Sequence, residues 1–88
     1  MPSLKSKKQK ERFKLLNTLG AKVAFYRRRL ELSQQELEDA AKLASGTVSR
    51  VESNLVLPTR GTLFRIANVL RLDKKEVAYL FDINFYNE

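Results

Sequence analysis

Apolar residues recur at intervals of three and four along the chain, and no segment alternates apolar and polar residues over the length of a strand. This periodicity predicts an all-helical fold. The 88 residues are enough for one small domain, which would bury roughly 60% of its unfolded surface. The pattern is clearest in the first predicted helix, where spacings of four, three and four place four residues on one face: Leu19, Val23, Tyr26 and Leu30.

Capping residues divide the chain into short helices. Ser33, followed three residues later by Glu36, has the spacing of a capping box, and Thr59 and Asp73 are further N-cap candidates. The first helix is expected to reach residue 30. It begins either near residue 8 or after a separate short helix that precedes Gly20. The other helices are expected at residues 34–42, 44 or 45 to 53, 60–70 and 74–81, with these side chains inward: Leu37, Ala41, Val48, Val51, Leu63, Ile66, Ala67, Leu70, Val77 and Leu80.

The positive charge is concentrated near the start of the chain. Residues 1–29 carry ten basic groups and one acidic group, a net charge of +9, whereas residues 30–88 carry seven and nine, a net charge of −2. A basic segment beside a nearly neutral body indicates a polyanionic partner, with nucleic acid first and an anionic membrane second. The alternative is a solubilising tail.

The residue types that are missing exclude several kinds of chemistry. The chain has no cysteine and no histidine, so disulfides, thiol chemistry, cysteine-based metal sites and histidine catalysis are excluded. We therefore expect no catalytic residues, no metal, no cofactor and no enzyme activity. No apolar run approaches the ~20 residues that span a bilayer, and no apolar stretch follows the first basic residues as in a secretory signal. The expected location is the cytoplasm, with a transit peptide as the alternative interpretation of the basic start.

The stretch LSQQELEDAAKLASGTVSRVESNLVLP, Leu32 to Pro58, contains two short helices with a brief connection, the helix-turn-helix arrangement. It resembles the phage-repressor (Cro-like, xenobiotic-response-element) helix-turn-helix family, chiefly through Ser33-Gln34 and Ser49-Arg50-Val51-Glu52 at fixed spacing. The resemblance continues through LFRIANVL, residues 63–70, and covers residues 19–81. It implies a compact five-helix, lambda-repressor-like domain at residues 19–81, a basic arm or helical extension at 1–18 and a tail at 82–88.

The resemblance also implies which residues contact DNA. The predicted helix at about residues 45–53 becomes the recognition helix in the major groove. Arg50 is the strongest candidate to read a base, because a guanidinium matches guanine O6 and N7; the alternative is a phosphate contact or a solvated side chain. For Gln34 the alternative to a phosphate contact is local capping, and for Arg60 it is an exposed helix start. The full set of candidate DNA-binding residues is Gln34, Ser45, Gly46, Thr47, Ser49, Arg50 and Arg60.

A further implication of the resemblance is an ion pair between Arg27 in the first helix and Glu52 at the end of the third. The pair would be structural, so Glu52 is not expected to be a catalytic carboxylate. It would tie the first helix to the recognition helix.

The sequence departs from the family pattern at five positions. Glu38 stands where the family prefers a small residue, and Lys42 where it prefers glycine in the turn between the two motif helices. Glycine is also usual at three helix ends that here carry Glu31, Asn54 and Arg71. Glu, Lys and Arg adopt a left-handed conformation at a cost of roughly 1 kcal/mol each. These ends therefore either avoid positive φ or are strained.

Together these features predict a sequence-specific DNA-binding transcription regulator, more specifically a repressor, that binds double-stranded DNA as a homodimer on two-fold-related half-sites. The main alternative is the antitoxin of a toxin–antitoxin pair, which binds a toxin protein and regulates its own gene. A basic membrane-surface helix at residues 5–30 is a third hypothesis; otherwise no membrane contact is expected. The candidate dimer contacts, which alternatively cover their own core, are Phe81, Ile83, Phe85 and Tyr86.

Overall fold

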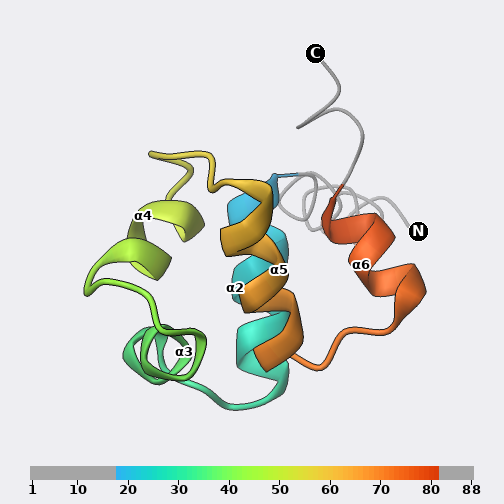
Figure 1. The fold of residues 1–88 in the computed structure, drawn as a ribbon, viewed down its shortest axis with the longest axis horizontal. Helices are drawn as coiled ribbons and strands as arrows, with labels where there is room; N and C mark the ends of the chain where they lie inside the picture. Colours follow the sequence, from blue (N-terminus) through green and yellow to red (C-terminus); the bar gives the residue numbers. More distant parts are fainter. Residues whose placement is uncertain (1–17, 82–88) are drawn as a thin grey trace, which may run out of the picture.

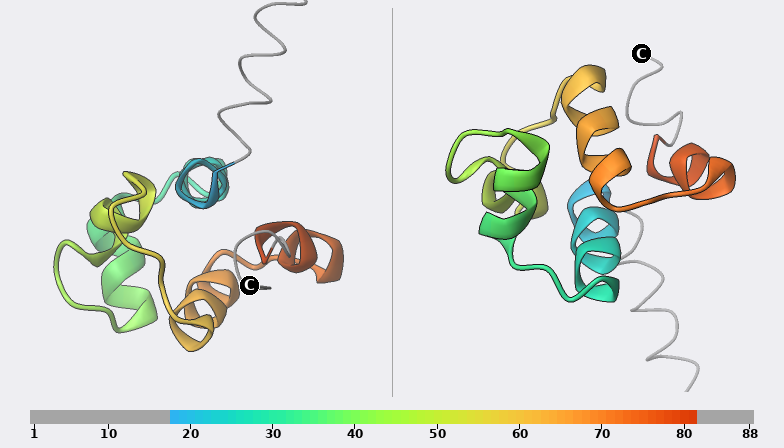
Figure 2. Two further views of the ribbon diagram at one scale, coloured as in Figure 1. Left: turned by 90° about the horizontal axis from the view of Figure 1, so that it is seen from above. Right: turned by 60° about the horizontal axis from the view of Figure 1, so that its bottom comes forward.

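The computed structural model describes residues 18–81. Within that range it is all-helical, with no strand, as the sequence predicts. Figures 1 and 2 show α2 and α5 in the middle of the domain, α3 and α4 together on one side of them, and α6 on the other. The helices are α2 (Leu19–Arg29), α3 (Gln34–Ala41), α4 (Thr47–Glu52), α5 (Arg60–Val69) and α6 (Lys74–Leu80).

Side-chain caps begin four of the five helices. Ser33 and Asp73 form complete capping boxes with Glu36 and Glu76 at the starts of α3 and α6, and Thr59 caps α5. Thr18 is extended and accepts a hydrogen bond from the backbone of Ala21, so α2 begins at Leu19. The alternative of one continuous helix from near residue 8 is therefore wrong. A separate short helix before Gly20 would lie in residues 1–17, outside the described residues.

The apolar face of every helix contributes to one core. Leu30 and Val77 differ from the prediction: Leu30 is 37% exposed because α2 has already ended there, and Val77 is half-buried at the edge of the core. The residues of the buried cluster are Leu19, Val23, Tyr26, Leu37, Val48, Val51, Leu63, Ile66, Ala67, Leu70 and Leu80.

Four helix ends without glycine are left-handed. Glu31, Lys42, Asn54 and Arg71 have φ of 56°, 58°, 60° and 57°. At each end the next residue donates its N–H to a carbonyl five positions back, as Leu43 does to Glu38 at 2.8 Å. The domain therefore accepts the strained alternative. Asn54 has a compensating contact, since its Oδ1 accepts a hydrogen bond from the backbone N–H of Gly20 at 2.9 Å.

Gly20 lets the start of α2 approach the end of α4. A Cβ at this position would lie 2.4 Å from the carbonyl oxygen of Glu52 and 2.6 Å from that of Val51. Both atoms belong to the backbone, so they cannot move aside as a flexible side chain would. The contact between α2 and α4 therefore depends on the absence of a side chain at Gly20.

A buried lysine joins α6 to α2. Lys22 is 1% exposed, and its Nζ donates a hydrogen bond to the carbonyl oxygen of Tyr79 at 2.7 Å. The same ammonium lies 4.0 Å from the centroid of the Tyr79 ring, within cation–π range. On the surface, Arg29 of α2 also forms an ion pair with Glu76 of α6. The two contacts hold α6 on the side of α2 away from α4.

Candidate nucleic-acid interface

The helix-turn-helix consists of α3, a short turn and α4. The turn begins at the left-handed Lys42 and ends at Gly46, which has φ of 87° and caps α4 without a side-chain hydrogen bond. The predicted start of this helix at residue 44 or 45 is wrong, because the left-handed Gly46 cannot be part of a right-handed helix. Ser45 and Gly46 therefore lie in the turn, and α4 itself covers only Thr47–Glu52.

The inner face of α4 is fixed in the core and its outer face is open. Val48 and Val51 are 0% and 1% exposed. Ser45, Ser49 and Arg50 are exposed, whereas Gly46 and Thr47 are half-buried. The structure thus brings five of the predicted DNA-binding residues together at the turn and along one short helix.

Arg50 folds back toward the beginning of α4. Its Nη1 lies 2.8 Å from the position that a Cβ on Gly46 would take. The absence of a side chain at Gly46 leaves room for the guanidinium over the first turn of the helix. Arg50 as a whole is exposed.

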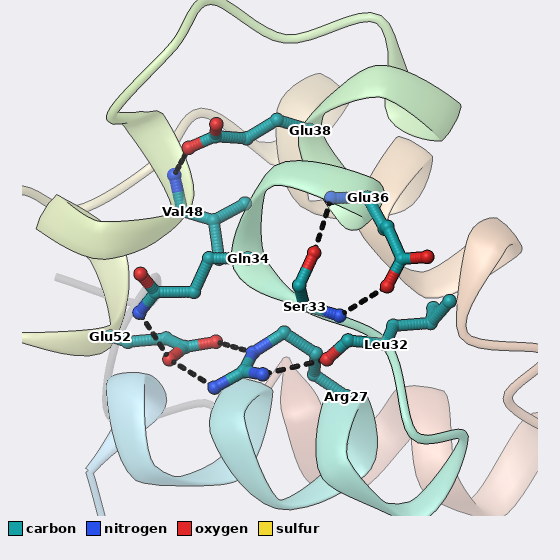
Figure 3. Close-up of polar contacts among 8 residues, drawn as sticks. All are labelled: Arg27, Leu32, Ser33, Gln34, Glu36, Glu38, Val48 and Glu52. Carbon is teal, nitrogen blue, oxygen red and sulfur yellow. Dashed lines mark hydrogen bonds and ion pairs between the residues drawn. The ribbon is translucent and has the colours of Figure 1, made fainter.

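Glu52, the last residue of α4, is held by two side chains from other helices (Figure 3). The Nε and Nη2 of Arg27 donate to Oε2 and Oε1 of Glu52 at 2.6 and 3.0 Å. Nη1 of Arg27 also donates to the carbonyl oxygen of Leu32 at 2.7 Å. The guanidinium therefore joins α2, the segment before α3 and the end of α4.

Gln34 has a role in this network that the sequence did not indicate. Its Nε2 donates to Oε1 of Glu52 at 2.9 Å, so the first residue of α3 contacts the last residue of α4. The amide oxygen of Gln34 points away from Glu52 in Figure 3. A phosphate contact by Gln34 would therefore have to coexist with its contact to Glu52.

Glu38, noted only as a departure from the family pattern, is a buried carboxylate. It is 4% exposed, and its Oε2 accepts a hydrogen bond from the backbone N–H of Val48 at 2.9 Å (Figure 3). The sequence did carry a signal for this contact. Glu38 is an acidic residue on α3, and the next helix, α4, has no capping side chain at its start. Arg60, the remaining candidate, is the exposed first residue of α5, beyond the loop that follows α4.

The helix-turn-helix profile of the Cro/C1 type matches residues 23–77, which include α3, the turn, α4 and α5. The chain belongs to the Cro/C1-type helix-turn-helix family. Comparisons with curated proteins and with solved structures gave no match.

Membership of the Cro/C1-type family gives the general function. Domains of this family are DNA-binding modules of transcription regulators, not enzymes, and their partner is double-stranded DNA. Within residues 18–81, none of the helices has the length and apolar character needed to cross a membrane. The outer face of α4 and the turn before it, which together carry most of the predicted DNA-binding residues, are the candidate interface.

Proposed function

We propose that the chain is a sequence-specific repressor that reads the major groove with the exposed face of α4. The observation that carries the proposal is the division of α4 into two faces. Val48 and Val51 are buried, while Ser49 and Arg50 are exposed. An α-helix presented in this way fits the major groove, where each base pair has its own donor and acceptor pattern.

The contacts divide into base reading and backbone positioning. Arg50 is the residue proposed to read a base, with Ser45 and Ser49 beside it on the same surface. Thr47, Gln34 and Arg60 are proposed to contact phosphates, since hydroxyl, amide and guanidinium groups all donate to phosphate oxygens. Gly46 contributes by its lack of a side chain, which permits both the left-handed turn and the position of Arg50.

A homodimer on two half-sites ~34 Å apart would double the contact area on DNA. Of the aromatic residues proposed for the dimer contact, Phe81 packs against Phe64 with ring centroids 4.5 Å apart. Ile83, Phe85 and Tyr86 lie outside the described residues, as does the tail at 82–88. A dimer that covers its operator would repress by exclusion of other proteins, and the cytoplasm is the compartment that this role implies.

The experiment is a selection of bound sequences from random duplex DNA with the full chain. The proposal predicts enrichment of one motif, with half-sites related by a two-fold axis if the dimer forms. Bound DNA without an enriched motif would contradict sequence-specific binding. The antitoxin hypothesis, in which the same fold mainly binds a toxin protein and also regulates its own gene, is tested separately by the presence of a neighbouring small toxin gene.

A further inference from the structure

The N-terminus of α4 is stabilised from α3 rather than from its own cap. Gly46 occupies the N-cap position and offers no side-chain acceptor. The N–H of Val48, two residues later, lacks an intrahelical partner as all N–H groups in the first turn do. Oε2 of Glu38 accepts its hydrogen bond at 2.9 Å, so a residue of α3 takes the place of an N-cap side chain.

This contact matters because α4 is too short to hold its own geometry. It has six residues, and isolated helices shorter than about 12 residues are marginal in water. Two buried valines fix the depth of α4 in the core, and Glu52 fixes its C-terminal end through Arg27 and Gln34. Glu38 is the contact at the other end, where the base-reading residues are gathered.

We propose that Glu38 is a positioning residue for DNA recognition: its buried carboxylate sets the orientation of the first turn of α4, and with it Ser45, Ser49 and Arg50. This inference rests on the proposed DNA reading by α4. Glu38 is 4% exposed, so it is not itself available to DNA. A carboxylate at this end also interacts favourably with the positive end of the helix dipole.

The test separates positioning from stability and from charge. Glu38→Met keeps nearly the same volume but removes the acceptor, whereas Glu38→Gln keeps an acceptor oxygen. Asp39→Asn is the charge control, because Asp39 is an exposed neighbour on α3 and its replacement changes the net charge by the same amount as either variant. Each protein is titrated with a selected duplex and with a scrambled duplex of equal length. Hydrogen exchange of the Val48 amide is measured in parallel, without DNA.

The proposal predicts that Glu38→Met speeds exchange of the Val48 amide and lowers the ratio of selected to scrambled affinity by roughly tenfold. Glu38→Gln retains most of both properties, and Asp39→Asn retains them fully. A Glu38→Met protein with the wild-type ratio and wild-type Val48 exchange overturns the proposal. If Glu38→Met unfolds generally and also loses the ratio of selected to scrambled affinity, Glu38→Gln decides. Fast exchange of the Val48 amide in Glu38→Gln, combined with wild-type specificity, overturns the proposal.

Failure of the proposed function would give a different result. If the unsubstituted chain shows the same affinity for every duplex, α4 does not read bases, whatever Glu38 does. The Val48 exchange rates then show separately whether Glu38 holds the first turn of α4.

Discussion

The guanidinium of Arg27 contacts both carboxylate oxygens of Glu52, at 2.6 and 3.0 Å, and so joins α2 to the last residue of α4. The two side chains are only 10% and 7% exposed. When one partner of such a pair is removed, the other charge remains buried without its counterion. α4 is thus fixed to the rest of the domain through a contact that is costly to break.

Arg27→Ala should therefore lower the free energy of unfolding by about 3–5 kcal/mol. Arg28→Ala is the matched control, since Arg28 is the next residue of α2 and is exposed. Thermal or urea unfolding of the two variants measures the difference. An Arg27→Ala protein with an unchanged thermal midpoint would show that the pair is not structural.

Arg71→Gly should raise stability by about 0.5–1 kcal/mol, because Arg71 has φ of 57° and glycine adopts this conformation without strain. Arg71→Ala removes the same side chain but keeps the Cβ, and it should give no such gain. Thermal unfolding compares the two. Equal midpoints for the glycine and alanine variants would mean that the left-handed conformation is not a source of strain at this helix end.

The sequence predicted the helices and much of the core because both depend on local signals. The capping box at Ser33 and Glu36, for example, requires only residues three positions apart. The predicted start of α4 is too early, because Gly46 is left-handed and lies in the turn. This conformation arises from how the turn packs, and the glycine itself is the only local sign of it.

Contacts between distant residues could not be inferred from periodicity. The hydrogen bond from Val48 to Glu38 and that from Gln34 to Glu52 depend on the relative placement of α3 and α4. The contact of Lys22 with Tyr79 likewise depends on the placement of α6, because Tyr79 is 57 residues away in the chain. Among the polar contacts of the site, only the Arg27–Glu52 pair was anticipated, and the family resemblance implied it rather than the spacing.

The surface pair between Arg29 and Glu76 should make part of the stability depend on pH. The hydrogen bond from Arg29 lowers the pKa of Glu76 below its ordinary value of 4.5, and the backbone N–H of Asp73 lowers the pKa further. The folded state therefore favours the ionised carboxylate. Its stabilising effect is fully present above the ordinary pKa and disappears as the pH falls through the lowered one.

Glu76→Gln measures this effect, because a protonated glutamic acid and a glutamine are both neutral. The thermal midpoint of the unsubstituted chain should exceed that of the variant by a constant amount at neutral pH, and the gap should narrow below about pH 4.5. Thermal unfolding at a series of pH values checks this. A gap that stays constant into strong acid would contradict the pairing.

Deletion of residues 1–10 tests the basic arm, which lies outside the described residues. The deletion removes four lysines, Lys5, Lys7, Lys8 and Lys10. The slope of log K against log salt should flatten by about 0.9 for each phosphate that these lysines neutralise in the complex, and binding to all sequences should weaken alike.

Replacement of these four lysines by glutamine keeps the length of the arm and should give the same flattening. An unchanged slope in both variants would reject the role of the arm on DNA. If the deletion variant also became monomeric in sedimentation, the segment would instead belong to the dimer contact.

The most direct test of base reading by α4 compares the unsubstituted chain with Arg50→Ala on a selected duplex and on every single-base variant of it. Lys75→Ala serves as the charge control, because Lys75 is exposed on α6, on the other side of the domain from α4 (Figure 1). Arg50→Ala should lose roughly 1–3 kcal/mol of binding free energy on the selected duplex and lose base preference at one position only. Equal weakening on all duplexes, with every base preference retained, would show that Arg50 contacts phosphate and that α4 does not read DNA through it.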